Sequence, residues 1–405
     1  MAQPKNYPAA DQFASGNFVS GSDAPELKEV RVGFIPLTDC ASVVIASLMK
    51  FDEKYGIKIV PCKQPSWAAV RDKVVNGELH AAQALYGLVY GVHLGIGGVK
   101  KDMAVLMTLN NNGQGISLAS QLKDKGVIDG PSLAKLIKTQ DRDYIFAHTF
   151  PTGTHAMWLY YWLASYGIDP ISDIKTITVP PAQMVMNARL GGMDGFCVGE
   201  PWNARGIYDK VSFSVASSQD IWPDHPEKVL TATAEFVAQN PSTARALIMS
   251  MLDAAKFIDV QANRARVAEL IASPDYVDAP AEVIAGRFMG NYDNGLGKTW
   301  HDTNHMKFFN DGKVSFPYLS DGMWFLTQFK RWGLLKEDPD YLAVAKQINR
   351  IELYRQAAAQ LNVAVPDDVM RSSTLMDGTV WDGKDAKGYA AGFAVHEGCT
   401  ELDLS

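Results

Sequence analysis

A single histidine, His155, stands where a predicted strand gives way to a predicted helix. The apolar run 143–150 predicts a buried strand, the turn 151–154 follows it, and a periodic apolar helix then runs to Gly167, with Pro170 just beyond. His155 is therefore expected in the first turn of a helix, at the C-terminal edge of a strand. Free backbone N–H groups and the helix dipole favour a small anion there. The alternative is a histidine that only caps the helix or packs in the core.

Repeated strand–helix units surround this segment. Strands are predicted at 30–36, 58–64, 81–85, 104–109 and 116–120, and again at 144–150, 174–179, 195–198 and 211–216. Helices are predicted to 51, at 66–79 and at 183–190, while 122–142 reads as a charged surface helix and loop. From 227 onwards the pattern indicates helices, at 227–261, 262–273, 280–288, 306–309, 321–332 and 341–361. Two βα series with a helical return predict an α/β fold of two lobes with a ligand cleft between them.

The expected domain organisation follows from these series. A chain of 405 residues exceeds the size at which one core usually stops growing. We expect a polar N-terminal tail (1–27), a first part of lobe 1 (28–120), lobe 2 (121–231), a mostly helical return to lobe 1 (232–365) and a wrapping or partly ordered C-terminal tail (366–405).

Composition excludes several partners. The chain has 47% hydrophobic and 20% charged residues and a net charge of −7, which argues against nucleic acid or an anionic membrane as a direct partner. No apolar run approaches the roughly 18 residues that a membrane span needs. Because the chain is acidic overall, an anion site in it must be a locally basic region.

The N-terminal residues and the cysteines favour a cytoplasmic protein. Residues 1–27 contain no apolar stretch typical of an export signal. Cys40, Cys62, Cys197 and Cys399 lie far apart, so neither a zinc site nor a disulfide framework is predicted. We expect reduced thiols and no metal.

Several ordered motifs resemble those of the nitrate-binding protein family. These proteins are substrate-binding subunits of nitrate and bicarbonate ABC importers, and a cytoplasmic relative, the NasS-type nitrate/nitrite sensor, belongs with them. The motifs that carry the resemblance are Gly-Phe-Ile-Pro-Leu-Thr-Asp-Cys-Ala (33–41), Pro-Ser-Trp-Ala-Ala-Val-Arg-Asp (65–72), Asn-Asn-Gly-Gln-Gly-Ile (111–116), Thr-Phe-Pro-Thr-Gly-Thr-His-Ala-Met-Trp-Leu (149–159), Phe-Cys-Val-Gly-Glu-Pro-Trp-Asn-Ala (196–204) and His-Pro-Glu-Lys-Val-Leu (225–230).

The resemblance implies a two-lobed periplasmic-binding-protein fold of type II and a set of anion-binding positions. The implied binding residues are Trp67, Gly113, Gln114, His155 and Lys228, with Pro181 as a weaker correspondence.

The chemistry of these side chains suits nitrate. Nitrate is a planar monoanion that only accepts hydrogen bonds, and Lys228 offers a positive charge with three N–H donors. Gln114 offers two amide donors, Trp67 one indole N–H, and His155 one ring N–H or two if protonated. Each residue alone has a plainer reading: Trp67 in a helix core, Lys228 solvated near a helix start, Gln114 satisfying backbone groups.

The resemblance also implies a role. In the bicarbonate branch the histidine and lysine give way to neutral and acidic side chains, so His155 and Lys228 favour nitrate or nitrite. Without an export signal, the sensor is the expected member: it holds a NasT-type antiterminator with an ANTAR domain and releases it when the anion binds. The alternative is an importer subunit that has lost its leader. The sequence shows neither a nucleophile–base pair nor a cysteine-rich strip, either of which would indicate an enzyme. No cofactor is expected.

Overall fold

The computed structural model describes residues 23–140 and 142–398. Within them, strand β6 (Ile145–His148) leads through a short turn into helix α5 (Thr154–Ala164), whose N-cap is Gly153. His155 therefore lies in the first turn of a helix that follows a strand, as predicted. The predicted helix start at Ser66 is also confirmed, because the Ser66 hydroxyl accepts the Ala69 N–H at 3.2 Å at the N-terminus of α2 (Trp67–Val75).

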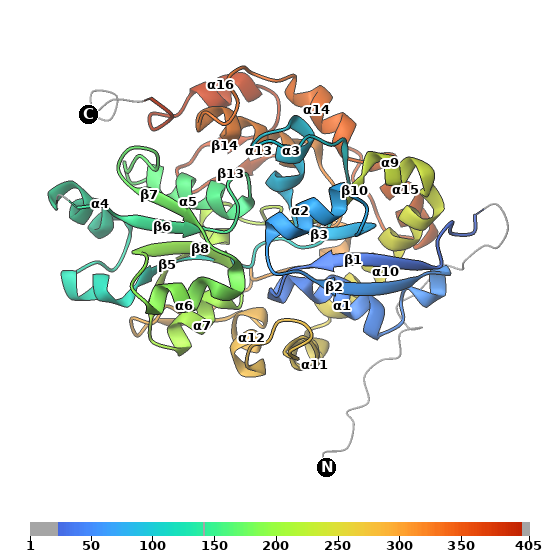
Figure 1. Cartoon of the computed structure of the whole chain (residues 1–405), viewed down its shortest axis with the longest axis horizontal. Helices are drawn as coiled ribbons and strands as arrows, with labels where there is room; N and C mark the ends of the chain where they lie inside the picture. The colour runs from blue at the N-terminus through green and yellow to red at the C-terminus, as the bar shows by residue number, and fades with distance from the viewer. Residues whose placement is uncertain (1–22, 141, 399–405) are drawn as a thin grey trace, which may run out of the picture.

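The first sheet has the strand order β2-β1-β3-β10-β4. Its strands are β1 (Glu29–Phe34), β2 (Lys58–Lys63), β3 (Ala81–Leu85), β4 (Met103–Thr108) and β10 (Lys228–Thr233). Strand β1 is parallel to β2 and β3, whereas β10 runs antiparallel to β3 and β4. Helices α1 (Ala41–Leu48) and α10 (Pro241–Asp259) pack on one face, and α2 and α3 (Tyr86–Leu94) on the other (Figure 1).

The second sheet repeats this pattern with the order β7-β6-β8-β5-β9. Its other strands are β5 (Gln114–Ala119), β7 (Lys175–Thr178), β8 (Gly195–Gly199) and β9 (Ser212–Ser217). Strand β6 is parallel to β7 and β8, and β5 is antiparallel to β8 and β9. The two sheets lie in separate halves of the molecule (Figure 1), so the two-lobed periplasmic-binding-protein fold is confirmed.

The chain passes twice between the two sheets, and this corrects the expected lobe boundaries. Strand β5 pairs in the second sheet, so lobe 2 begins before Gln114 and not after residue 120. Strand β10 pairs in the first sheet, so lobe 2 ends before Lys228 and not after residue 231. The two crossing segments are bridged to each other at Asn111 and Pro226, which brings both next to the ends of β5 and β10.

Three helical predictions after residue 226 need correction, each for its own reason. Strand β10 occupies the start of the expected helix 227–261, because it inserts between β3 and β4 and is buried along its whole length. Residues 306–309 form no helix, because Lys307 makes backbone hydrogen bonds with Asn111 instead. The expected helix 341–361 is divided at Asn349 and Arg350 into two helices, α14 (Tyr341–Ile348) and α15 (Ile351–Gln360).

The remaining elements complete the two lobes. The other helices are α4 (Gly130–Thr139), α6 (Met184–Arg189), α7 (Trp202–Tyr208), α8 (Ser218–Ile221), α9 (Ala234–Gln239), α11 (Gln261–Ile271), α12 (Ala281–Phe288), α13 (Leu319–Arg331) and α16 (Ala386–Ala391). Two small hairpins are formed by β11 (Asn291–Asp293) with β12 (Thr299–His301), and by β13 (Ser373–Thr374) with β14 (Val380–Trp381). No helix in residues 23–140 and 142–398 is long and apolar enough to cross a membrane.

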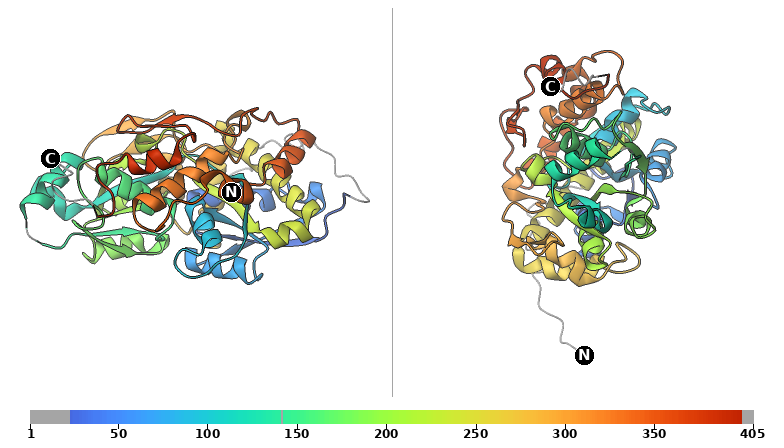
Figure 2. Two further views of the ribbon diagram at one scale, coloured as in Figure 1. Left: turned by 90° about the horizontal axis from the view of Figure 1, so that it is seen from above. Right: turned by 90° about the vertical axis from the view of Figure 1, so that its left-hand side faces the viewer.

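The C-terminal segment wraps along one side of the molecule (Figures 1 and 2). Its backbone reaches lobe 2, where the Met376 N–H donates to the Ile221 carbonyl at 2.8 Å. On α13, its Arg371 pairs with Asp321 at 2.6 Å, and its Trp381 indole donates to the Ser320 carbonyl. Residues 399–405, including Cys399, lie outside the described part, as do residues 1–22 of the predicted N-terminal tail.

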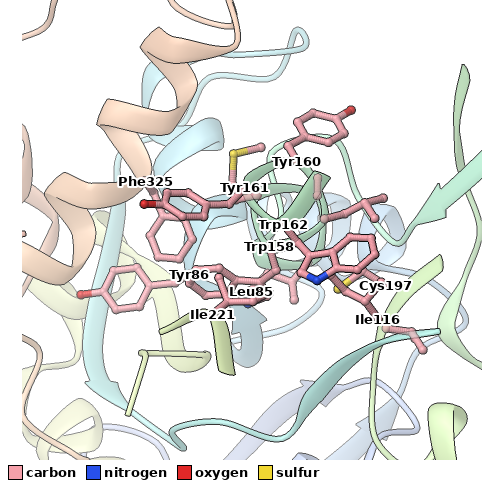
Figure 3. Packing of buried hydrophobic residues seen from close by; sticks show 14 of the residues in the cluster. Leu85, Tyr86, Ile116, Trp158, Tyr160, Tyr161, Trp162, Cys197, Ile221 and Phe325 are labelled. Carbon is pink, nitrogen blue, oxygen red and sulfur yellow. The ribbon is translucent and has the colours of Figure 1, made fainter. Parts of the chain in front are cut away.

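Helix α5 lies at the centre of an aromatic core that joins the lobes. The Trp158 ring stacks obliquely on Trp324 of α13, with a centroid distance of 4.9 Å, and meets Phe325 and Trp222 at 5.9 and 6.0 Å. Figure 3 shows Trp158 among side chains from both lobes and α13. This apolar packing holds the N-terminal turn of α5 in place against the crossing segments.

Candidate functional site

The two sheets bring one lysine, two carboxylates and two glutamines together where their strand ends meet. Lys228 is the first residue of β10, Gln83 belongs to β3, Gln114 opens β5, and Asp39 follows β1 in the 3₁₀ turn Thr38–Cys40. Glu227 immediately precedes Lys228. Each of these side chains is 0% or 1% exposed, so the whole group is closed off from solvent. We call Asp39, Gln83, Gln114, His155, Glu227 and Lys228 the Lys228 cluster.

Lys228 is held by both carboxylates. Its Nζ donates to Asp39 Oδ2 at 2.8 Å and to Glu227 Oε1 at 2.9 Å. Burial opposes the ammonium charge, but the two carboxylates more than offset it and raise the pKa of Lys228. A lysine ammonium has three N–H donors, so one remains without an acceptor among the described residues. The alternative of a solvated lysine near a helix start is therefore excluded.

Glu227 is the more firmly held carboxylate. Besides Lys228, it accepts hydrogen bonds from the Thr154 hydroxyl at 2.6 Å and from the Trp158 indole at 3.0 Å. Burial alone raises the pKa of this carboxyl, but the charge of Lys228 and these donors hold the pKa at about 2. Glu227 is therefore ionised throughout the neutral range.

Asp39 also accepts from three donors, Lys228 and two glutamine amides. Gln83 Nε2 donates to Oδ1 at 2.5 Å, and Gln114 Nε2 approaches Oδ2 at 3.3 Å. The Ile35 N–H donates to Gln83 Oε1 at 3.1 Å, which fixes the orientation of that amide. Burial outweighs the opposing effect of Lys228 and raises the pKa of Asp39.

His155 contacts Gln114 across the lobe 2 side of the cluster. Its Nε2 lies 2.5 Å from Gln114 Oε1, and its Nδ1 lies 2.6 Å from the Thr149 hydroxyl. Because Gln114 Nε2 donates to a carboxylate, Gln114 Oε1 faces the ring and only accepts. His155 therefore donates from Nε2, and its neutral form accepts from Thr149 at Nδ1.

We expect the His155 imidazole to stay neutral at mildly acidic and neutral pH. Burial, with Lys228 adding to it, lowers the pKa of His155 to about 3. The unfolded chain binds this proton near pH 6.5, so the folded state loses stability as pH falls from 6.5 towards 3. Over this range the free energy of unfolding should fall by about 1.4 kcal/mol per pH unit more than it does in the His155→Gln variant, which has no imidazole at this position. Imidazole NMR shifts recorded from pH 5.5 to 8 should show no titration of His155; a midpoint near 6.5 would contradict this.

Trp67 lies over the cluster with an unused donor. It is the first residue of α2 and fully buried, and the Lys228 Nζ lies 5.7 Å from the centre of its ring. The indole Nε1 has no hydrogen-bond partner among the described residues. A buried donor without an acceptor is costly, so an acceptor placed beside Lys228 would stabilise this arrangement.

The structure thus brings together four of the six sequence-predicted positions by side-chain contact: Trp67, Gln114, His155 and Lys228. Gly113 precedes Gln114 at a φ of +89°, and an added Cβ there would collide with the Met306 side chain, so glycine is required at this turn. Pro181 begins the 3₁₀ turn Pro181–Gln183 and is buried, but no described contact joins it to the cluster.

Three cluster members were not predicted from the sequence: Asp39, Gln83 and Glu227. Gln83 is the one polar residue of strand β3, Ala-Ala-Gln-Ala-Leu, which is a usable sign of a buried polar contact. Asp39 follows a strand end, as ligand-binding residues often do in α/β sheets. Glu227 carries no such sign, since a carboxylate beside a lysine is common on any surface.

Known proteins similar to this chain include proteins named for binding nitrate, nitrite or bicarbonate. Residues 23–272 match the NMT1-like family. The nitrate/nitrite binding protein NrtA of Synechocystis is 37% identical, over 92% of this chain and 86% of that protein. The bicarbonate-binding protein CmpA of Synechococcus elongatus is 31% identical, over 90% of this chain and 85% of that protein.

A solved structure extends the similarity to the fold. The periplasmic nitrate-binding protein NrtA from Synechocystis PCC 6803 superimposes with a TM-score of 0.88 and 36% identity, covering 91% of this chain and 99% of that one. The chain belongs to the NMT1-like family, among the nitrate- and bicarbonate-binding proteins.

Proposed function

We propose that this protein binds nitrate or nitrite at the Lys228 cluster and serves as the solute-binding subunit of an anion importer. One observation carries the proposal: Lys228, Gln114 and Trp67 each keep one N–H donor without an acceptor, around a single buried ammonium. Lys228 Nζ and Gln114 Nε2 converge on the same oxygen, Asp39 Oδ2, at 2.8 and 3.3 Å. Nitrate has three acceptor oxygens and no proton to donate, which matches three donors and no required acceptor.

Burial of the cluster indicates how affinity arises. A charged pair is strong only where water is excluded, and here Lys228 is 0% exposed. Gln83 and Asp39 come from lobe 1 and Gln114 and His155 from lobe 2, so the anion would be enclosed when the lobes close. Opening of the lobes would then admit and release it.

The importer role is favoured over the cytoplasmic sensor. The relatives named above are binding proteins, and the similar solved structure is of a periplasmic one. The antiterminator partner and the cytoplasmic location stay predictions from the sequence, and no described contact bears on either. Both roles require the same anion site, so the test of the site comes first.

Bicarbonate is the second candidate ligand. A bicarbonate-binding relative is 31% identical, and Asp39 and Glu227 offer acceptors for a ligand hydroxyl. The retained Lys228 favours nitrate, because an anion without a proton relies on donors and positive charge alone, while His155 holds the Gln114 amide in place through its Nε2–H.

The proposal is tested by isothermal titration of the full chain in chloride-poor buffer with nitrate, nitrite, bicarbonate and an alkylsulfonate. We expect one saturable site for nitrate or nitrite and weaker binding of the other two. Saturable binding of bicarbonate or alkylsulfonate, with neither nitrate nor nitrite bound, would overturn the proposal.

Trp67→Phe isolates the contribution of the indole N–H. The ring is kept and a single donor is removed, so we expect nitrate affinity to fall by about 1.5–3 kcal/mol, typical of a hydrogen bond to a charged group. Trp300→Phe, on the distant hairpin strand β12, is the matched control and should bind as the unmodified protein does. Equal nitrate affinity of both variants would remove Trp67 from the site.

A further inference from the structure

We propose that the anion binds together with one proton, and that the carboxyl group of Asp39 takes up this proton. The inference rests on the proposed function and concerns how the Lys228 cluster accommodates a further negative charge. It makes Asp39 a binding residue that changes from acceptor to donor when the site fills.

The charges of the cluster require such a step. His225, which lies 3.6 Å from Glu227, is neutral near pH 7 because burial lowers its pKa to about 4. With His155 also neutral, two carboxylates and one ammonium leave one excess negative charge before any ligand enters. A monoanion would raise that excess to two in a site that solvent does not reach. An uncompensated buried charge costs several kcal/mol, whereas one proton restores the charge of the empty cluster.

The position of Asp39 makes it the carboxylate in question. Its Oδ2 accepts from Lys228 Nζ and from Gln114 Nε2, the two nitrogens whose remaining N–H groups would face the anion. An ionised Oδ2 beside a nitrate oxygen would place two like charges in contact. A protonated Oδ2 would instead donate to that oxygen and add a donor to the site.

Glu227 is the poorer choice for the proton. Two of its donors, Thr154 and Trp158, are not among the groups proposed to bind the anion, so its protonation would disrupt hydrogen bonds that the anion does not replace. The pKa values agree in direction, since burial raises that of Asp39 while Lys228 and the neighbouring donors hold that of Glu227 at about 2.

The groups facing Asp39 come from every element packed on it. Lys228 and Glu227 lie at the start of β10, Gln83 on β3 and Gln114 on β5, with His155 of α5 behind Gln114. Burial lowers the pKa of His155 to about 3 and raises that of the adjacent Cys40 thiol, so both stay neutral. Neither is expected to exchange a proton near pH 7.

The proton balance is simple. As the lobes close, an O–H bond forms at Asp39 Oδ2 with a proton from solvent. The anion accepts from the free N–H groups of Lys228 Nζ and Gln114 Nε2, and the hydroxyl formed at Oδ2 donates to it. Asp39 Oδ1 continues to accept from Gln83, whose amide is fixed by the Ile35 N–H. No bond is broken other than that of the buffer acid that supplies the proton.

The experiment is nitrate titration calorimetry of the full chain between pH 6 and 9, at each pH in two buffers of different ionisation enthalpy. We expect uptake of one proton per nitrate where Asp39 of the empty protein is ionised, with affinity falling about tenfold per pH unit in that range. Asp39→Asn keeps an acceptor for Gln83 and a donor towards the anion, so it should bind nitrate without proton uptake and with an affinity independent of pH.

The matched control is Asp52→Asn. Asp52 is another buried carboxylate of lobe 1, but it accepts from the Ile59 and Glu53 N–H groups away from the cluster. This variant should keep the proton uptake of the unmodified protein.

The outcomes are separable. Nitrate binding without proton uptake in the unmodified protein would overturn the inference and leave the proposed function intact. Unchanged uptake in Asp39→Asn would assign the proton to another group. Absence of binding of both nitrate and nitrite would overturn the proposed function and the inference together. The proton count of the unmodified protein decides the matter even if Asp39→Asn does not fold.

Discussion

Replacing Lys228 by alanine is expected to reduce nitrate affinity by about 2–5 kcal/mol, the cost of removing one partner of a buried charge pair. Lys228 carries the one ammonium of the Lys228 cluster, and its Nζ lies where Asp39, Glu227 and Gln114 meet. The variant loses both the positive charge and the donor aimed at the ligand. Titration calorimetry with nitrate measures the loss directly.

The control for this variant is Lys101→Ala. Lys101 also pairs with a carboxylate, Glu235 at 2.8 Å, but both side chains are solvent-accessible. An exposed pair contributes at most about 1 kcal/mol, and none of that concerns the ligand. If Lys228→Ala bound nitrate as Lys101→Ala does, the anion site would lie elsewhere.

The second large effect concerns stability and follows from Glu227→Ala. This change leaves the Thr154 hydroxyl and the Trp158 indole without their acceptor and leaves Lys228 with Asp39 alone. Breaking a buried ion pair from one side destabilises a protein by about 3–5 kcal/mol. Urea unfolding of the anion-free variant should show a loss of this size in the free energy of unfolding.

Glu235→Ala is the surface counterpart, since Glu235 pairs with Lys101 in solvent. Its expected effect is small, because exposed ion pairs contribute little to stability. Glu227→Gln, which keeps an acceptor oxygen, should fall between the two. A Glu227→Ala protein as stable as Glu235→Ala would show that the buried pairing of Lys228 contributes nothing to folding.

The local units of the fold were predictable because their causes are local. The sequence pattern of an apolar strand, a Gly-containing turn and a periodic helix predicts the β6–α5 segment, and the structure places His155 as expected. The Ser66 cap of α2 is likewise set by residues close in sequence. The alternation of strands and helices was enough to predict two α/β lobes.

Strand β10 was missed because its cause is not local. Lys228–Thr233 becomes a central strand only when the chain returns from lobe 2 and inserts between β3 and β4. The β-branched Val229, Thr231 and Thr233 favour a strand, but the lysine at its start reads as a solvated residue. The lobe boundaries were misplaced for the same reason. Strand β5 follows the strands of the first sheet but pairs in the second, and β10 follows the strands of the second sheet but pairs in the first.

The candidate site was half predictable. The resemblance supplied the donors Trp67, Gln114, His155 and Lys228, and the structure brings them together. It did not supply Asp39 and Glu227, because reasoning from donors alone gives no place to carboxylates in an anion site. Asp39 and Lys228 are 189 positions apart, and the spacing of residues in the sequence cannot reveal a contact over such a separation.

The most direct test of the account is a crystal structure of the protein with nitrate. We predict a planar anion enclosed between the sheets, with oxygens within hydrogen-bond distance of Lys228 Nζ, Trp67 Nε1 and Gln114 Nε2. Nitrate bound at another place, with Asp39 and Glu227 still the sole partners of Lys228, would contradict it.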